Sequence, residues 1–567
     1  MYDVCIIGAG QSGLTTCKTF IEKNYKVIVL EKSLNHNGMF ENIKEKDKFT
    51  WSTSRYMSGF SDFPMDKKLP VWFTIQNYID YLKSYIKHFG LDKYIQYNSN
   101  VTSCKLDNNN EWVIQYNNTS LICKKLIICA GLNQTPKYPN IIQNFKGKII
   151  HTQEVYNNMT EKDWYNTFSN KRVLLLGGGE SAFDIGHIIT KYTKDLYFSS
   201  KNYIEWFPTG GETNKSLETI NYKCFNKKEL LSINLSNPTD TQLLYNEYSL
   251  PEPMSFIWHN YGRYLLNIMN QDCPKCIHGH EKLCNINKTP DNLFKKYVTK
   301  RTDFMIDIHA NKVKIVYYPD KIEGTTIYTK EELIDNIDII VCATGFKKSF
   351  SFLDKYIYDR KFIKKIIPVD IPNIAFIGYA RPTMGSIAMI AEMQSWWVLL
   401  YFEKTLNYRI RTPLFRNEDP LNLENEHINS LVIGCYYLKD LARDMNIEPN
   451  MLSLLFTDWK LFFTIYTGSC HPMIYRLNGQ KYHSKGRENL LNTFPTIKSK
   501  DTIQIVYITM FVLFHIIFII GCFIMGYIFM KLTQLLFKNN IKYDSVFKLV
   551  YIYTGLLILY FYNNDRL

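Results

Sequence analysis

The chain has 567 residues, a length that allows two or three domains with hydrophobic cores. Its 46% hydrophobic and 21% charged residues are typical of a globular protein. The net charge of +14 comes from scattered Lys and Arg without a long basic run, so we expect a solvated basic surface and no nucleic-acid partner. The thirteen cysteines lie mostly alone in apolar segments, which favours reduced thiols in a cytosolic setting.

The N-terminal stretch YDVCIIGAGQSGLTT predicts a buried parallel strand, a glycine-rich turn and a helix. Gly8 permits a tight turn, Gly10 lets the backbone approach a pyrophosphate, and Gly13 lets the helix pack closely on the strand. The next predicted strand, KVIVLEK, ends at Glu31, whose carboxylate is placed to accept hydrogen bonds from a ribose. This unit predicts a dinucleotide site, and an N-terminal unit of this kind usually holds FAD.

The stretch KRVLLLGGGESAFDIG, residues 171–186, repeats the strand, turn and helix. Its turn contains Gly177, Gly179, Ser181 and Ala182. The following strand, DLYFSSKNY, ends without an acid and carries Ser199, Ser200 and Lys201 instead. Two hydroxyls and an ammonium can hold a 2′-phosphate that an acid would repel. We therefore expect NADPH rather than NADH, the alternative being that these three are only solvated strand-end residues.

The C-terminal part contains an apolar stretch at residues 503–530, in which His515 is the only group that titrates near neutral pH. About 20 apolar residues suffice to cross a bilayer, so this stretch predicts a transmembrane helix. A second apolar run at 546–562 contains Lys548 and predicts either a second span or an interfacial helix. Because Met1 leads directly into a strand and not into a signal peptide, we expect the N-terminal bulk in the cytosol and a tail anchor.

Several stretches resemble segments of the flavin-containing monooxygenases, over roughly residues 1–400. They are EKSLNHNGMF (31–40), SRYMSGFSDFPM (54–65), FKGKIIH (145–151), IIVCATGF (339–346) and GYARPTMGSIAMIAEMQSWW (378–397). The resemblance implies that O₂ forms a C4a-hydroperoxyflavin, which passes one oxygen atom to a small soft nucleophile, an amine or a sulfide. Because the cofactor carries this chemistry, it needs no metal, no catalytic triad and no obligatory protein partner. It also implies an endoplasmic reticulum membrane location.

Motif positions assign cofactor contacts to individual residues. Those expected at FAD are Gly8, Ala9, Gly10, Gln11, Ser12, Gly13, Glu31, Met39 and Phe40. Those expected at NADPH are Gly177, Gly179, Ser181, Ala182, Ser199, Ser200, Lys201 and Asn202.

The chain departs from the family pattern at two positions near the expected chemistry. Many members carry an Asn where this chain has Ser52, followed by Thr53. These hydroxyls are our candidate catalytic groups, but a hydroxyl lacks the paired donor and acceptor of an amide, so oxygenation can be less well coupled to NADPH use. Four residues after His151, where the family has an aromatic residue, this chain has Val155, and Tyr156 follows it. A Baeyer–Villiger enzyme would show Trp there, which disfavours that activity.

Three further features have competing interpretations. We expect His151 to order the linker between the two nucleotide units and not to donate a proton in the reaction. Arg55 either meets a phosphate or carboxylate near the flavin or is solvated. The stretch CPKCIHGHEKLC contains Cys273, Cys276, His278, His280 and Cys284. For it we favour free thiols on an exposed insertion. A structural zinc is disfavoured because a second zinc-binding knuckle is missing, and a redox pair because the stretch lies far beyond the glycine turn at Gly177.

The predicted fold class is α/β, with two Rossmann-like doubly wound domains, the NADP domain inserted in the FAD domain, and a C-terminal transmembrane anchor. The expected segments are the FAD domain at 1–150 with its return at 325–410, the NADP domain at 165–325, a helical extension at 410–500, and the membrane segments 503–530 and 546–562. The leading function is NADPH-dependent N- or S-oxygenation. The alternatives are an oxidase that releases H₂O₂, a Baeyer–Villiger monooxygenase, and a non-enzymatic membrane-tethered redox sensor.

Overall fold

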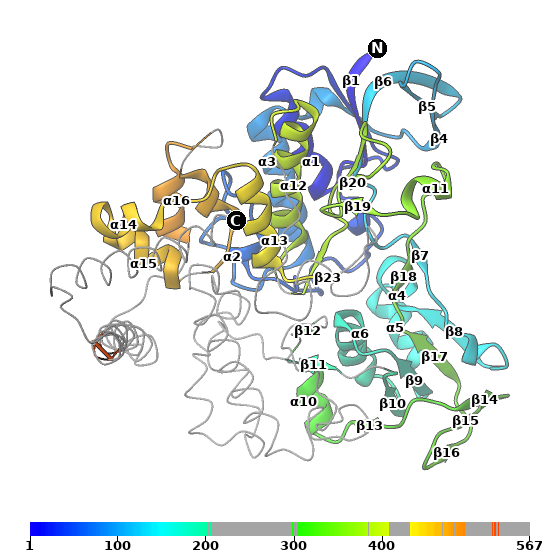
Figure 1. Cartoon of the computed structure of the whole chain (residues 1–567). Coiled ribbons are helices and arrows are strands. Elements are labelled where there is room, and N and C mark those ends of the chain that lie inside the picture. The colour runs from blue at the N-terminus through cyan, green and yellow to red at the C-terminus, as the bar shows by residue number, and fades with distance from the viewer. Residues whose placement is uncertain are drawn as a thin grey trace. The chain divides into compact units, whose positions relative to one another are not determined.

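A computed structural model describes most of the chain (Figure 1). The described residues are 1–201, 204–206, 298–299, 301, 303–383, 385–406, 431–467, 469–477, 479, 483–493, 524, 527–528 and 531. The chain divides into two compact units, Met1–Phe494 and Pro495–Leu567. All strands and helices named below belong to the first unit.

The first sheet is built around parallel strands from the N-terminus. Its order is β3 (Ile95–Gln96), β2 (Val27–Leu30), β1 (Tyr2–Ile7), β6 (Thr119–Ile128), β5 (Trp112–Tyr116) and β4 (Val101–Leu106), with β21 (Ile374–Phe376) also paired to β6. β1 is parallel to both β2 and β6, so the carboxyl ends of these strands lie at one edge. Alternate residues of β1 enter two different hydrophobic clusters, Val4 and Ile6 in one and Cys5 and Ile7 in the other. This explains why the strand is apolar almost throughout: both of its faces are covered.

Helices α1 (Gln11–Ile21), α3 (Ile75–Phe89) and α12 (Ile387–Phe402) cover one face of this sheet, and we call sheet and helices the first lobe (Figure 1). α12 packs against α1 and is buried on nearly every side. That burial explains its composition, because a helix without a solvent face is apolar all round. The few polar side chains on α12, among them Glu392 and Gln394, are therefore buried and have specific partners.

The second sheet has the order β13 (Val313–Ile315), β10 (Asp195–Ser199), β9 (Arg172–Leu176), β17 (Ile339–Cys342) and β8 (Lys148–His151), all parallel. Its helices are α4 (Thr152–Asn158), α5 (Glu161–Phe168), α6 (Glu180–Thr190) and α10 (Asp303–His309), and we call this part the second lobe. The strands extend beyond the expected segment 165–325 at both ends. The reason is topological. β17 pairs with β9 on one side and with β8 on the other, so both β17 and β8 belong to this sheet although they lie outside 165–325.

The two lobes are joined by chain segments that pair with one another. β7 (Thr135–Pro136) on the outgoing connection is antiparallel to β18 (Phe346–Lys347) on the returning one. The remaining strands form small sheets: β11 (Glu205–Trp206) with β12 (Val298–Thr299); β14 (Lys321–Glu323), β15 (Thr326–Tyr328) and β16 (Leu333–Ile334); β19 (Phe362–Ile363) with β20 (Ile367–Pro368); and β22 (Arg381–Pro382) with β23 (Leu431–Val432).

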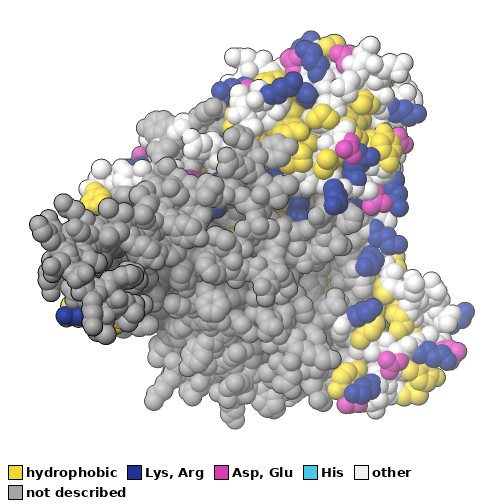
Figure 2. Space-filling view, viewed as in Figure 1, with side chains coloured by type: hydrophobic (Ala, Val, Ile, Leu, Met, Phe, Trp, Pro, Cys, Tyr) yellow, Lys and Arg dark blue, Asp and Glu magenta, His cyan; other side chains and the backbone are white. Residues whose placement is uncertain are grey.

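Short helices complete the described structure. They are η1 (Gly38–Phe40), α2 (Arg55–Ser58), η2 (Asp92–Tyr94), η3 (Asn140–Ile142), α11 (Lys355–Tyr358), α13 (Gly434–Asp444), α14 (Met451–Thr457), α15 (Trp459–Thr467), η6 (Pro472–Arg476) and α16 (Gly486–Thr493). The described part of the predicted extension 410–500 is thus largely helical. On the face shown in Figure 2, Lys and Arg side chains are spread over the described surface with acidic side chains between them.

The described residues include no helix that is long and apolar enough to cross a membrane. The predicted spans 503–530 and 546–562 fall almost entirely outside the described residues; only Ile524, Tyr527 and Ile528 of the first are described. The structure therefore gives no support to the C-terminal anchor.

Candidate functional site

Residues 8–13, which we call the first cradle, form the turn between β1 and α1. Gly8 has φ +102°, a conformation that favours glycine, and a Cβ there would lie 2.7 Å from the Cys129 carbonyl oxygen. A Cβ on Gly13 would lie 1.9 Å from the Gly8 carbonyl oxygen, so only glycine lets α1 approach this closely. A Cβ on Gly10 would meet nothing within 4 Å. Protein atoms therefore leave no room for a side chain at Gly8 or Gly13, whereas the space next to Gly10 is free. A pyrophosphate can approach the backbone there.

The first turn of α1 supports the same fit. α1 has Gly10 as its N-cap, and no side chain caps it. The N-terminal amides of a helix attract anions, because their N–H groups have no partner within the helix. The residues present therefore match the phosphates of a dinucleotide at this position.

Glu31, at the end of β2, is buried and bound to the cradle itself. Its Oε2 accepts a hydrogen bond from the Ala9 N–H at 2.7 Å, and its Oε1 accepts one from the Ser33 N–H at 2.9 Å. Each carboxylate oxygen keeps a second lone pair, so the side chain can still accept hydrogen bonds from a ribose. The sequence prediction missed that Glu31 also braces the turn.

The other residues expected at FAD gather round this cradle. η1 lies over it, since a Cβ on Gly38 would come 3.5 Å from Cα of Gly10. Met39 in η1 is exposed, whereas Phe40 is buried against Trp51. Ser12 faces a glycine from far along the chain, because a Cβ on Gly378 would meet its Oγ at 2.3 Å.

Trp51 and Tyr78 were missed by the sequence prediction. The Tyr78 hydroxyl donates to Oε1 of Gln11 in the cradle at 2.5 Å, and its ring stacks on Trp51 with centroids 4.1 Å apart. The indole N–H of Trp51 has no acceptor within the part of the chain that the structure describes. Their signal was the aromatic richness around 49–85, which core packing explains equally well from sequence alone.

Ser52 and Thr53 directly follow Trp51. The Trp51 N–H donates to the Phe73 carbonyl at 2.7 Å, and the Thr53 carbonyl accepts from the Ser58 hydroxyl at 3.2 Å, so hydrogen bonds to its backbone groups hold both ends of this short segment. Thr53 is buried and Ser52 is half-buried. The structure thus brings the two candidate catalytic residues next to an aromatic cluster that reaches the first cradle; their role in the chemistry stays a prediction.

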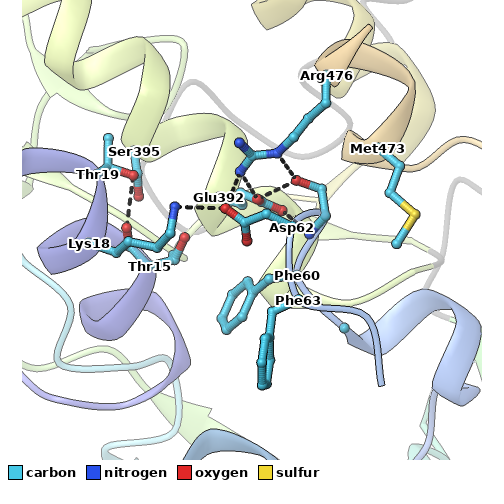
Figure 3. Close-up of polar contacts among 12 residues, drawn as sticks. Thr15, Lys18, Thr19, Phe60, Asp62, Phe63, Glu392, Ser395, Met473 and Arg476 are labelled. Atoms are coloured by element: carbon cyan, nitrogen blue, oxygen red, sulfur yellow. Dashed lines mark hydrogen bonds and ion pairs between the residues drawn. The ribbon is translucent and has the colours of Figure 1, made fainter. Parts of the chain in front are cut away.

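The stretch 54–65 ends in a buried ionic cluster, whose contacts Figure 3 shows. Asp62 pairs with Lys18 of α1 at 2.7 Å and with Arg476 of η6 at 2.7 Å, and Arg476 also pairs with Glu392 of α12 at 2.9 Å. Burial raises the pKa of Asp62, but the charges of Arg476 and Lys18 outweigh this and lower it overall. We call Lys18, Asp62, Glu392 and Arg476 the brace, since they join α1 to three distant segments.

The pKa of Glu392 is shifted in the opposite direction from that of Asp62. Burial raises the pKa of Glu392, and the attraction of Arg476 does not fully offset it. Its oxygens accept hydrogen bonds from the Ser61 N–H at 3.0 Å and from the Ser61 hydroxyl at 2.5 Å. Phe60 and Phe63, which flank Ser61 and Asp62 in the sequence, point away from the charges (Figure 3). Their rings pack on Tyr81 and Tyr85.

Residues 177–182, the second cradle, repeat the geometry between β9 and α6. A Cβ on Gly177 would meet the Ala343 carbonyl oxygen at 2.3 Å, whereas one on Gly179 would meet nothing within 4 Å. Gly179 is the N-cap of α6, again without a side-chain cap. Ala182 is buried in the helix, and Ser181 is half-buried beside it. The second cradle therefore also fits a pyrophosphate.

The end of β10 differs from the end of β2. The Ser199 side chain is fully buried, and its hydroxyl has no hydrogen-bond partner among the described residues. Ser200 lies against the glycine turn, since a Cβ on Gly178 would come 2.9 Å from its Oγ. Lys201 is exposed and Asn202 lies outside the described residues. A buried hydroxyl that lacks a protein partner, beside a second hydroxyl and an ammonium, fits a phosphate-bearing ligand.

His151 and Tyr156 lie where the two lobes are joined. His151 accepts the Gln153 N–H on Nδ1 at 3.2 Å, so its Nε2 carries the proton and donates to the Gly345 carbonyl at 3.0 Å. Burial lowers the pKa of His151, which favours this neutral form. His151 thus bonds the outgoing connection to the returning one. The Tyr156 ring packs on Phe49 with centroids 4.6 Å apart.

Neither of the other two features forms a described ligand site. The stretch 273–284 lies outside the described residues, and elsewhere in the described chain no three His, Cys, Asp or Glu residues lie together as metal ligands. Arg55 donates to the Leu69 carbonyl and, at 3.0 Å, to the Tyr56 hydroxyl. The cysteines that the structure describes are buried, and none of them forms a disulfide bond.

Comparisons with known proteins agree with this arrangement. The family model "FMO-like: Flavin-binding monooxygenase-like" matches residues 2–536. A 4-hydroxybenzoate brominase (decarboxylating) of Marinomonas mediterranea is 28% identical over 521 residues, covering 88% of this chain and 93% of that protein. Flavin-containing monooxygenase 5 of Rattus norvegicus is 26% identical over 529 residues, covering 87% and 92%.

Among solved structures, OTEMO in complex with FAD and NADP has a TM-score of 0.53 at 16% identity and covers 71% of this chain and 85% of that one. At this identity the likeness shows the fold, an α/β fold shared with flavin monooxygenases. The family match extends over almost the whole sequence. The chain therefore belongs to the flavin-binding monooxygenase-like family, whose members use FAD and NADPH, and it is a flavin-dependent monooxygenase.

Proposed function

We propose that this enzyme transfers one oxygen atom from O₂ to the nitrogen or sulfur of a small molecule, with NADPH as electron donor. The observation that carries the proposal is the pair of cradles with different strand ends: Glu31 at the first, and at the second Ser199, whose hydroxyl has no partner among the described residues. Flavin-containing monooxygenase 5 of rat and the motif resemblance support the choice of reaction. A soft nucleophile reacts without being activated by a protein base, so the site needs few catalytic side chains.

The residues present have distinct tasks in this reaction. When bound, FAD and NADPH supply the activation of O₂ and the hydride. The first cradle and the N-terminus of α1 hold the FAD phosphates, while Glu31 accepts hydrogen bonds from its ribose. Ser199, Ser200 and Lys201 hold the 2′-phosphate of NADPH.

The Ser52 segment and its neighbours act closer to the reacting atoms. The Ser52 hydroxyl donates or accepts one hydrogen bond at the oxygen being transferred. The rings of Phe40, Trp51 and Tyr78 limit the access of water to that place.

A second candidate is halogenation of an aromatic acid. It is favoured by one observation, the similarity to a 4-hydroxybenzoate brominase along 88% of this chain. In that case bromide replaces the amine or sulfide as the species that receives the oxygen atom, and the aromatic acid then reacts with the oxidised bromide.

One experiment separates the candidates. The purified holoenzyme is given NADPH and O₂ together with trimethylamine, methimazole, or bromide plus 4-hydroxybenzoate, and products, NADPH consumption and H₂O₂ are measured. N-oxide or S-oxide in near-equal amount to NADPH supports the proposal, and brominated product only with bromide supports the second candidate. Full H₂O₂ yield with every addition would contradict both and identify an oxidase, for which Ser52 in place of Asn gives a reason.

We also propose that residues 503–530 attach the enzyme to a membrane, because their composition suits a bilayer span. The family resemblance supports the endoplasmic reticulum as that membrane. The full chain should stay with membranes in alkaline carbonate, whereas a chain ending at residue 500 should be released. If the shortened chain stays in the membrane fraction, another part of the protein provides the attachment.

A further inference from the structure

Arg301 is a buried arginine of the second lobe, and its side chain is 10% exposed. Its Nε lies 2.7 Å from Oδ1 of Asp184 and 3.7 Å from Oε2 of Glu180. Its Nη2 donates to Oδ2 of Asp184 at 3.2 Å. Both acids belong to α6, and Glu180 is the first residue of that helix, directly after Gly179. The guanidinium is therefore attached to the helix whose N-terminus forms the second cradle.

The same guanidinium also reaches the first lobe. Nη1 donates to the Thr50 hydroxyl and Nη2 donates to the Thr50 carbonyl. Thr50 is followed by Trp51 and Ser52, and it forms a β-bridge with Thr74 at the start of α3. Two parallel N–H donors on one residue constrain both distance and orientation, which a single ammonium does not.

A tyrosine adds a further contact to this junction. The Tyr156 hydroxyl donates to Oδ2 of Asp184 at 3.0 Å, and its carbonyl accepts the Lys44 N–H at 3.0 Å. Asp184 is thus held both by Arg301 and by a residue that contacts the first lobe. Burial raises the pKa of Asp184 to about 6, and the attraction of Arg301 offsets part of that effect. Arg301 thus favours the ionised form of the Asp184 carboxyl.

The contacts of Arg301 with Asp184 and Thr50 lie between the two expected cofactor sites, where they can affect hydride transfer. A hydride passes between two cofactors only when they are held at contact distance, and a misplacement of about 1 Å can cost about 100-fold in rate. Arg301 contacts α6, whose N-terminus forms the second cradle. It also contacts Thr50, which lies just before the candidate catalytic residues Ser52 and Thr53 in the first lobe.

We propose that Arg301 is a positioning residue that sets the second cradle against the Thr50–Thr53 segment, so that NADPH reduces the flavin at full speed. This inference rests on the proposed use of the two cradles by FAD and NADPH, but it is independent of which substrate is oxygenated. Arg301 acts through Thr50 and α6.

The test compares Arg301→Gln and Arg301→Lys with a matched control, Arg172→Gln. Arg172 also pairs with an aspartate of the second lobe, Asp195 at 3.4 Å, but within the second sheet. Flavin content, affinity for NADP⁺ by calorimetry, and the anaerobic rate of flavin bleaching by NADPH are measured on each holoenzyme. No oxygenation substrate is added, so the result does not depend on the reaction class.

We expect Arg301→Gln to keep its FAD and to bind NADP⁺ within about 3-fold of wild type, while flavin reduction slows by about 100-fold. Arg301→Lys should recover part of the rate, because it restores the charge but not the two-pronged contact. Arg172→Gln should reduce its flavin at the wild-type rate. A loss of NADP⁺ affinity equal to the loss of rate would mean that Arg301 only shapes the cofactor site, and it would overturn the proposal, as would an unchanged rate.

A second variant covers the case in which Arg301→Gln loses its flavin. Thr50→Val keeps the shape of the side chain and removes one acceptor of Arg301, so we expect reduction to slow by about 3- to 10-fold with FAD content unchanged. A wild-type rate in Thr50→Val would then contradict the proposal. Wild-type enzyme whose flavin is not bleached by NADPH would instead show that the proposed function fails.

Discussion

The two cradles have the same turn but differ in what holds them. The first is secured by its own lobe: Glu31 binds the Ala9 N–H, and Gly13 lets α1 sit against the turn. The second has Ala182 at the position equivalent to Gly13. The strand that follows its helix, β10, ends at Ser199, whose hydroxyl has no partner within the described chain. A cradle that is complete without ligand suits a cofactor that stays bound, and one with an unpartnered polar group suits a cofactor that comes and goes.

The first lobe is also supported from the C-terminal side, and this support gives the largest expected effect. Arg476→Met leaves Asp62 and Glu392 buried without their shared cation, which should lower the free energy of unfolding by about 3–5 kcal/mol and release FAD. Urea unfolding and flavin absorbance measure both. The matched control is Arg487→Met, because Arg487 pairs with Asp458 at 2.5 Å on the surface and its loss should cost less than about 1 kcal/mol. Equal losses of unfolding free energy in the two variants would show that the brace stabilises the protein no more than a surface ion pair does.

The tightness of the two turns can be compared directly. Gly13→Ala places a Cβ 1.9 Å from the Gly8 carbonyl oxygen, so α1 must move. We expect a loss of about 1–3 kcal/mol in unfolding free energy together with loss of FAD. The reverse change in the second cradle, Ala182→Gly, should cost only about 0.5–1 kcal/mol and leave FAD in place. If Gly13→Ala purifies with full flavin, the first cradle is less tightly packed than we infer.

The support of the first lobe should also depend on pH, through His471. His471 accepts the Met473 N–H on Nδ1 and donates from Nε2 to the Gly59 carbonyl, each at 3.2 Å, and burial, with a contribution from Arg476, lowers its pKa to about 3. Below its usual pKa of about 6.5, the unfolded chain binds a proton that the folded protein does not, so stability is lost as pH falls from about 6.5 towards 3. At pH 5 this amounts to about 2 kcal/mol.

The measurement is urea unfolding at pH 7.5 and pH 5. The difference between the two pH values should shrink in His471→Gln and should persist in His88→Gln, whose histidine is exposed on α3. An undiminished difference in His471→Gln would assign the acid sensitivity to other groups.

The smallest effect is expected at the second cradle. Ser199→Ala removes a hydroxyl that has no partner in the described part of the chain. It should therefore leave stability and FAD unchanged while KM for NADPH rises by about 10-fold, the effect of one hydrogen bond to a charged group. KM for NADH should not change, because NADH lacks the 2′-phosphate. Steady-state kinetics with both coenzymes test this, and a parallel rise in both KM values would separate Ser199 from the phosphate.

Local pattern was enough to predict both cradles. A strand, a glycine turn and a helix are contiguous in sequence, and at Gly8 and Gly177 the backbone conformation itself requires glycine. The number of residues between Gly8 and Glu31 followed from the length of one helix, α1, and one strand, β2. The bounds of the second lobe were harder to place, because β8 and β17 join its sheet from opposite ends of the intervening chain. Nothing in the sequence of either strand indicates which sheet it enters.

By itself, the amino-acid sequence determined where the two glycine turns lie and predicted a cofactor for each, because those features depend on neighbouring residues and on the strand that follows. Only the tertiary structure decided the partners of the buried charges: Asp62 with Lys18 and Arg476, and Arg301 with Asp184 and Thr50. A buried charge needs an opposite charge or a donor at contact distance. The residue that provides it is selected by the path of the chain through space, which no local pattern records.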